Sequence, residues 1–235
     1  MTQREFRWGV SYLLLYTFVL PNVLSYGNLL LPQPLSEAKI NFIYFTVNLI
    51  CILLIGRRFL WNSLQTAMKA PFRCLRPAFL GLAVYFLTSF LLGNLILWIR
   101  PDFTNVNDSS IAAMTQDNFT LVSIGTVLLV PPVEEFLYRG LIFGRLYNRS
   151  KLAGYAVSTV LFAAIHVIGY IASFDAELLV LCFLQYLPAG LCLGWSYAKA
   201  DNIWAPILMH ITINQIGMQT MRGVLCRKSF SYLRM

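Results

Sequence analysis

The feature that most constrains this chain is a series of long apolar windows that contain almost no charged residue. Several reach the roughly 20 residues that an α-helix needs to cross a bilayer. Of the 235 residues, 58% are hydrophobic and only 12% are charged, whereas a soluble domain is about half apolar and about a quarter charged. Such a chain cannot cover itself with polar surface. It is therefore an integral membrane protein, which excludes a soluble enzyme and a secreted domain.

Seven such windows follow one another along the chain. They cover Trp8 to Leu31, Ile40 to Gly56, Pro77 to Ile99, Phe119 to about Leu146, Leu152 to Phe174, Leu178 to Ala198, and Ile203 to Met221. The first begins behind Arg4 and Arg7, and because it is too long for a secretory signal we expect it to be retained. The windows predict an all-α fold, a polytopic transmembrane helix bundle of seven to eight spans. We expect residues 1–235 to form a single membrane domain.

Basic and acidic residues occupy alternate loops between these windows. The loop after the second window is basic, with Arg57, Arg58, Lys69, Arg73 and Arg76. The next loop is acidic, with Asp102, Asp108 and Asp117 against a single Arg100. The positive-inside rule then predicts a multi-pass protein of the cell membrane with a cytoplasmic amino terminus. The formal net charge of +8 is thereby explained by anchoring at the cytoplasmic face, without a nucleic-acid partner.

The basic carboxyl-terminal tail does not fit this alternation. A complete seventh span would place it outside. It comprises Arg222, Arg227, Lys228 and Arg234. Either the last helix does not cross fully or this end violates the positive-inside rule, and the sequence leaves the choice open.

Paired carboxylates interrupt the fourth window, in the segment PPVEEFLYRG at residues 131–140. Ionisable groups at membrane depth are costly and mark functional candidates. On a helix, Glu135 and Arg139 are four positions apart in the order that favours an ion pair, and Glu134 lies about 100° round the helix and is left free. Alternatively, the span ends at Pro132 and the charges form an interfacial cap. Because apolar residues resume at once, we favour a buried pair.

The two histidines of the chain lie in two later windows. His210 is followed four residues later by Asn214, on the same helical face. Glu134 and His166 are each sixteen positions from the turn expected near Ser150, so antiparallel helices would bring them to the same depth. A histidine on an apolar face is also commonly a hydrogen-bonded packing residue, and this alternative stays open for His166.

Together these side chains could hydrolyse an amide bond. A buried carboxylate and an imidazole can remove a proton from water, and His210 with Asn214 could hydrogen-bond the oxyanion of a tetrahedral intermediate. Alternatively, Glu134, His166 and His210 could hold a divalent metal, with zinc suited to these ligands, that activates its bound water. The spacing leaves both routes open. No serine, cysteine or threonine has a recognisable nucleophile setting.

Three motifs in this order resemble the CPBP family of intramembrane proteases, also called the Abi family. They are EExxxRG at 134–140, FxxxH at 162–166 and HxxxN at 210–214, together with the run GLxLGWxYxKxxxIWxPILxH that ends at His210. The resemblance covers about residues 128–217, and the first three windows carry no such motif. The family includes type II CAAX prenyl endopeptidases and bacteriocin-processing or immunity proteins.

The resemblance implies an intramembrane endopeptidase that cleaves a membrane-associated peptide or protein. It implies that Glu134 activates water, that His166 is its partner, and that His210 and Asn214 face the oxyanion or a metal. Glu135 and Arg139 would form a supporting pair. Members are described as metalloproteases, although a metal-free glutamate mechanism has also been proposed for the prenyl-protein branch.

Two other functions remain open. A non-proteolytic relative could act as a membrane scaffold or a bacteriocin-immunity protein, but such a role gives no reason for five polar groups at bilayer depth. A proton-coupled transporter could use Glu134 and His166 as a relay. That function predicts broken helices at matching places in both halves of the chain. Adjacent prolines that could break a helix occur only at Pro131 and Pro132, with no counterpart in the other half. We therefore favour the endopeptidase.

Overall fold

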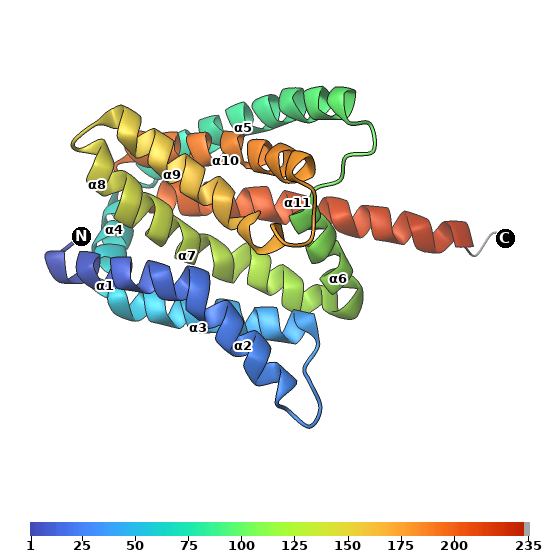
Figure 1. Cartoon of the computed structure of the whole chain (residues 1–235). Helices are drawn as coiled ribbons and strands as arrows, with labels where there is room; N and C mark the ends of the chain where they lie inside the picture. Colours follow the sequence, from blue (N-terminus) through green and yellow to red (C-terminus); the bar gives the residue numbers. More distant parts are fainter. Residues whose placement is uncertain (233–235) are drawn as a thin grey trace.

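The computed structural model describes residues 1–232, with side chains through residue 223, and its regular structure in that range is entirely helical (Figure 1). The α-helices are α1 (Gln3–Leu14), α2 (Leu20–Leu29), α3 (Glu37–Ile55), α4 (Arg57–Lys69), α5 (Pro71–Ile99), α6 (Val106–Ile124), α7 (Val130–Glu135), α8 (Gly144–Tyr147), α9 (Lys151–Ile165), α10 (Ala176–Ala200) and α11 (Trp204–Tyr232). Three π-helical segments and one 3-10 turn adjoin them: η1 (Leu15–Val19), η2 (Gly125–Leu129), η3 (Phe136–Phe143) and η4 (Ile168–Tyr170). The predicted all-α fold is confirmed.

Six helical segments of the described residues are long and apolar enough to cross a bilayer. They are Gln3–Leu29, Glu37–Ile55, Pro71–Ile99, Val106–Tyr147, Lys151–Tyr170 and Ala176–Ala200, and they correspond to the first six predicted windows. The seventh window is also helical, as α11. Polar residues such as His210, Asn214 and Gln215 lower its hydropathy, so α11 is not among the six. The protein is a multi-pass membrane protein, as predicted.

The longest span bends where the sequence places its start. Asn118 has φ −152° and ψ 89°, outside the helical region, and its side chain accepts a hydrogen bond from the Leu121 amide at 3.0 Å. This bend lies directly before Phe119, the predicted start of the fourth window, but the helical segment itself already begins at Val106. Pro131 and Pro132 lie in the first turn of α7, and because they lack N–H groups the preceding turn cannot close its usual bonds and adopts π-helical structure as η2. The span nevertheless continues through the prolines, so an interfacial cap at this point is wrong.

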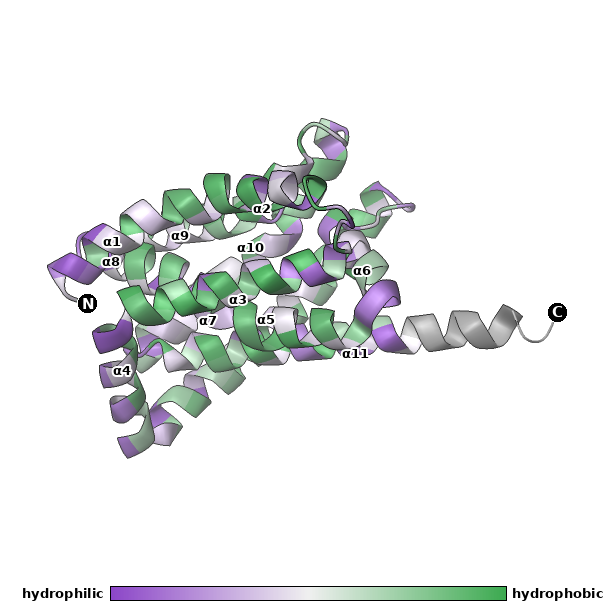
Figure 2. Ribbon diagram, turned by 90° about the horizontal axis from the view of Figure 1, so that it is seen from below, coloured by the Kyte–Doolittle hydropathy of each residue, from purple (hydrophilic) through white to green (hydrophobic). Residues whose placement is uncertain are grey.

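The helices form a bundle around α7 and η3 (Figure 1). Helix α10 packs against α5 and α9, and α11 packs against α5 and α10. Side chains of η3 fill the core, with Phe136 and Leu137 fully buried. Many large apolar side chains of the spans are exposed, which is the surface that lipid requires. The ribbon of the spans is accordingly mostly green, that is, hydrophobic, in Figure 2. Helix α4 lies across one end of the bundle (Figures 1 and 2).

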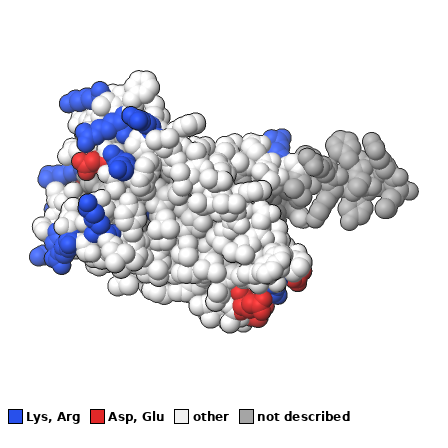
Figure 3. Space-filling model, turned by 90° about the horizontal axis from the view of Figure 1, so that it is seen from above, with Lys and Arg blue, Asp and Glu red and all other residues white. Residues whose placement is uncertain are grey.

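Charged side chains gather at the two ends of the bundle (Figure 3). We call the end that holds the amino terminus and α4 the basic end. At the other end, Arg100 lies 3.6 Å from Asp102, 3.3 Å from Asp175 and 4.0 Å from Glu177. This separation matches the predicted alternation of loops. Helix α11 runs away from the basic end (Figure 1), while the predicted basic side chains of Arg227, Lys228 and Arg234 lie outside the described residues.

Candidate active site

The centre of the site is a fully buried ion pair on the fourth span. Arg139 Nη1 lies 3.1 Å from Glu135 Oε1, and neither side chain is exposed. The second guanidinium nitrogen, Nη2, donates to the Gly190 carbonyl of α10 at 3.2 Å, and the guanidinium stacks over the Phe162 ring at 4.3 Å. The predicted Glu135–Arg139 pair is confirmed, and it joins three helical segments inside the bundle.

His210 of α11 is held by the same carboxylate. Its Nδ1 atom lies 2.8 Å from Glu135 Oε1. An ionised carboxylate can only accept hydrogen bonds, so Nδ1 donates here. The other ring nitrogen, Nε2, therefore faces Glu134, with Oε2 at 3.9 Å. Glu135 thus fixes both the orientation of the imidazole and the nitrogen that it presents to the neighbouring carboxylate.

Glu134 differs from Glu135 in that its carboxylate makes no hydrogen bond to Arg139 or His210. The side chain is buried, and Oε1 accepts a hydrogen bond from the Tyr16 hydroxyl at 3.4 Å. Oε2 is also buried but has no hydrogen-bond partner. A buried acceptor without a partner costs free energy, so this atom is a natural place for water or substrate to bind. Glu134 Oε2 therefore faces Nε2 of the imidazole without a hydrogen bond, whereas Glu135 Oε1 is hydrogen-bonded to Nδ1.

His166 also lies next to the Phe162 ring. It is the C-cap residue of α9, and its Nδ1 is 2.7 Å from the Phe162 carbonyl oxygen. Its ring stacks on Tyr186 of α10 with 4.1 Å between centroids. The Phe162 ring contacts both imidazoles, with centroids 4.8 Å from His166 and 5.8 Å from His210. The residue paired with Glu134 in this arrangement is thus His210, and the role of His166 as a partner stays a prediction.

Asn214 shares the face of α11 with His210, as the spacing predicts. Its amide nitrogen donates to the Thr126 carbonyl at 2.8 Å. Thr126 lies in η2, directly before the proline turn that carries the glutamates. The structure therefore brings Glu134, Glu135, Arg139 and His210 together, and it fixes Asn214 one turn further along the same helix.

Three π-helical segments contribute to this region. In each of them a backbone carbonyl accepts a hydrogen bond from a side chain of another helix. The Tyr16 carbonyl in η1 accepts a hydrogen bond from the Tyr44 hydroxyl at 2.9 Å. The Tyr138 carbonyl in η3 accepts one from the Ser158 hydroxyl at 2.9 Å. The bond from Asn214 to Thr126 in η2 is the third. A π-helical turn leaves carbonyls without their usual amide partner, and such turns are frequent at functional sites. Interhelical bonds to these carbonyls lock the bundle around the carboxylates.

Tyr16 is a residue of the site that the sequence motifs do not reveal. It lies in the first window, is 5% exposed, and stacks on Tyr44 of α3 with 5.8 Å between ring centroids. One turn earlier, the Tyr12 hydroxyl donates a hydrogen bond to the side-chain oxygen of Asn48. A buried tyrosine usually needs a hydrogen-bond partner for its hydroxyl, so a tyrosine within an apolar window is a signal that such a partner exists. Tyrosines are equally common at membrane interfaces, so the sequence does not show which partner is used.

The predicted metal ligands Glu134, His166 and His210 do not meet at one point. Within the described residues, no three His, Cys, Asp or Glu side chains are grouped so that they could hold an ion. Glu134 and His210 face each other, but His166 is bonded to the Phe162 carbonyl and stacked on Tyr186. A catalytic zinc site has three protein ligands at about 2.0 to 2.2 Å. This arrangement does not fit such a site.

Comparison with known proteins yields a family match and two relatives. The chain is 31% identical over 96 residues to the Bacillus subtilis (strain 168) protein named "Putative membrane peptidase YdiL", an alignment that covers 40% of this chain and 34% of that protein. It is 32% identical over 90 residues to "UPF0177 protein YxdF" of Lactococcus lactis subsp. lactis (strain IL1403), covering 38% and 44%. The chain therefore matches less than half the length of each relative. No solved structure matches it significantly.

The family match covers residues 116–216, and its description is type II CAAX prenyl endopeptidase Rce1-like. All six predicted site residues fall inside this segment: Glu134, Glu135, Arg139, His166, His210 and Asn214. Tyr16 lies outside it. The resemblance to the CPBP family is thus confirmed, and the segment that builds the site matches the Rce1-like type II CAAX prenyl endopeptidases.

Proposed function

We propose that this protein is an intramembrane endopeptidase that hydrolyses a peptide bond at or in the bilayer. The observation that carries this proposal is the unpartnered Glu134 Oε2 atom, 3.9 Å from His210 Nε2. This separation is too long for a direct hydrogen bond, and we propose that a water oxygen within hydrogen-bond reach of both groups connects them. The family match and the name of the Bacillus subtilis relative support the same reaction class.

In the first step, Glu134 activates water. A water molecule beside Oε2 loses a proton to the carboxylate while its oxygen attacks the carbonyl carbon of the substrate. The Tyr16 hydroxyl on Oε1 fixes the carboxylate, so that Oε2 is the oxygen that acts as the base. Burial excludes bulk water from the site and strengthens these electrostatic interactions.

In the second step, N–H groups of α11 stabilise the tetrahedral oxyanion. Glu135 and Arg139 hold His210 in place. In this proposal His210 is an imidazolium with a proton on each ring nitrogen throughout the reaction, so that Nδ1–H donates to Glu135 and Nε2–H to the oxyanion. The amide of Asn214, one turn along the helix, supplies a further N–H group. Glu134 then transfers its proton to the leaving amine, which completes hydrolysis and restores the carboxylate.

We propose a membrane-associated peptide or protein as the substrate. We also propose that the protein resides in the cell membrane with its basic end in the cytoplasm, because basic loops are retained on that side. The amino terminus, α4 and the loop at Ser150 would then face the cytoplasm.

Comparative membrane proteomics tests the proposed function. Membranes from cells that produce the wild type are compared with membranes from cells that produce Glu134→Gln. We expect one or more uncleaved precursors to accumulate in the variant. The exposed Glu177→Gln is the matched control and should behave as the wild type. A scaffold or immunity protein would instead give the same peptide pattern with Glu134→Gln as with the wild type.

A further inference from the structure

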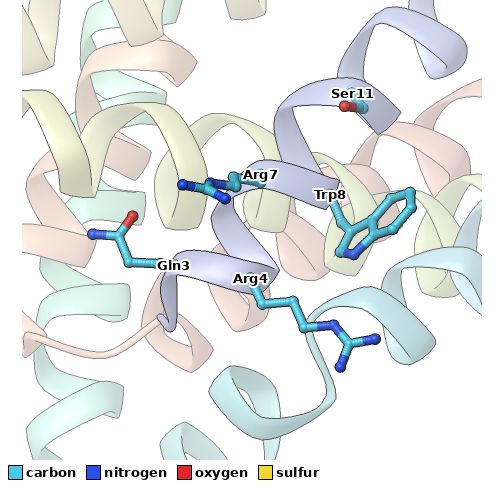
Figure 4. A pocket seen from close by; sticks show the side chains of 5 residues that line it. All are labelled: Gln3, Arg4, Arg7, Trp8 and Ser11. Carbon is cyan, nitrogen blue, oxygen red and sulfur yellow. The ribbon is translucent and has the colours of Figure 1, made fainter.

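Two pockets at the basic end share the same chemical composition. One has a volume of about 590 Å³ and lies along α1, with side chains of Gln3, Arg4, Arg7, Trp8 and Ser11 (Figure 4). The other has a volume of about 390 Å³ and lies along α4, with side chains of Arg57, Arg58, Trp61 and Asn62. Each therefore combines two guanidinium groups, one indole and one carboxamide. We call them the α1 pocket and the α4 pocket.

The two pockets lie beside the contact that joins α1 to α4. The Phe59 amide donates to Glu5 Oε1 at 2.9 Å, and Arg4 and Arg58 directly precede these two residues. Glu5 also forms a capping box with Thr2, so the end of α1 is already capped by its own side chains. The positive charge of the α1 pocket therefore comes from the arginine side chains rather than from the helix terminus.

The four pocket arginines are exposed, and none forms an ion pair with a carboxylate of the described residues. By contrast, the exposed Arg73 lies 3.8 Å from Asp201. The two indoles are also open, with Trp8 58% and Trp61 59% exposed. Tryptophan concentrates at the level of the lipid headgroups. Unpaired guanidinium groups at this level are suited to an anion supplied by the membrane.

We propose that the α1 and α4 pockets bind the phosphate groups of anionic phospholipids in the leaflet at the basic end. A guanidinium group binds phosphate oxygens with two parallel hydrogen bonds. The indole packs against the glycerol and upper acyl chain, and the carboxamide of Gln3 or Asn62 donates to headgroup oxygens. Basic clusters next to a span are attracted to anionic lipid, and these two clusters add an aromatic wall to each pair of charges.

Lipid bound in these pockets also supports the core next to the site. The Phe59 ring contacts the Phe136 ring edge-on, with 6.2 Å between centroids, and Phe136 follows Glu135. A side chain at Gly56 would overlap Phe136, so α4 begins in direct contact with η3. Headgroups that hold α1 and α4 in place therefore stabilise the folded state, because a ligand that binds only the folded state raises its stability.

The test uses the purified full chain in nanodiscs of phosphatidylcholine alone or mixed with phosphatidylglycerol. Native mass spectrometry measures which lipids stay bound after detergent extraction, and thermal unfolding measures stability. The pocket variants are Arg4→Gln with Arg7→Gln, and Arg57→Gln with Arg58→Gln. The matched control is Lys69→Gln with Arg76→Gln, which removes two exposed charges from the same end but from neither pocket.

We expect the wild type and the control to retain phosphatidylglycerol in preference to phosphatidylcholine and to unfold at a higher temperature in its presence. Each pocket variant should bind phosphatidylglycerol about tenfold more weakly, since each basic residue near the surface contributes several-fold in affinity. The two pairs test the proposal separately, so a folding defect in one leaves the other decisive. Equal loss in the control, no lipid preference, or equal stabilisation by inorganic phosphate would overturn it.

Discussion

Glu134 Oε2 and His210 Nε2 face each other across 3.9 Å, while the neighbouring Glu135 binds the other nitrogen of the same imidazole at 2.8 Å. Two adjacent carboxylates thus contact one histidine in different ways. Glu135 is neutralised by Arg139 and orients the ring. Glu134 is hydrogen-bonded to neither Arg139 nor an imidazole nitrogen, and its Oε2 has no hydrogen-bond partner, so it can accept a proton from water.

Replacing Arg139 with alanine is expected to destabilise the protein as well as inactivate it. The change removes one member of a fully buried pair and leaves the Glu135 charge uncompensated, which costs about 3 to 5 kcal/mol. Thermal or denaturant unfolding in detergent measures this loss. The exposed Arg149→Ala on the following loop is the control and should leave stability within about 0.5 kcal/mol of the wild type. Equal stability of Arg139→Ala and the wild type would contradict the buried pair.

Tyr16→Phe is expected to lower turnover about threefold to tenfold without a matching change in KM. The variant keeps the ring and its stacking on Tyr44 but removes the hydroxyl that donates to Glu134, a loss typical of one hydrogen bond. Tyr12→Phe is the matched control, because that hydroxyl bonds Asn48 instead. Steady-state kinetics on both variants decide the matter. Equal effects of the two changes would show that Tyr16 acts only through packing.

Much of the fold could be predicted because membrane spans are encoded by local composition. Windows of apolar residues are visible without any knowledge of contacts, and six of them became spans of the described chain. The ion pair of Glu135 with Arg139 was also predictable, since both residues lie on one face of one helix. These features depend on positions that are close in sequence.

The contacts between distant helices could not be predicted in the same way. Counting residues from the turn places His166 level with Glu134, but α9 ends at Ile165 and the His166 ring stacks on Tyr186. Likewise, nothing in the first window identifies Tyr16 as the partner of Glu134. The π-helical segments change the rotation of side chains along the spans, which a count based on 1.5 Å per residue does not include.

The end of the bundle opposite the basic end, where Arg100 pairs with Asp175, offers a test of pH dependence. The Leu178 amide hydrogen bond, with the Arg100 pair, holds the pKa of Asp175 below its ordinary value. A lowered pKa stabilises the folded state above the unfolded pKa of about 3.9, and this stability is lost as the pH falls through the lower folded pKa. The unfolding temperature of the wild type should therefore fall more steeply below about pH 4 than that of Asp175→Asn, which keeps a capping oxygen. Parallel curves would contradict this role.

Metal removal separates the two routes to an activated water. Since Glu134, His166 and His210 do not converge, we expect the purified protein to remain active after exhaustive chelation and to contain less than one equivalent of zinc. Elemental analysis and activity are measured on the same sample. Loss of activity that zinc alone restores, together with loss of zinc binding in His166→Ala, would instead support the ligand set predicted from the sequence.

The central claim is that Glu134 activates the water that cleaves the substrate. The most direct measurement uses a precursor that accumulates in Glu134→Gln membranes, reconstituted in liposomes with purified wild type or purified Glu134→Gln. We expect the wild type to cleave it and the variant to be slower by about a hundredfold or more, as removal of a general base requires, with an unchanged unfolding temperature. Cleavage by Glu134→Gln at the wild-type rate would contradict the account.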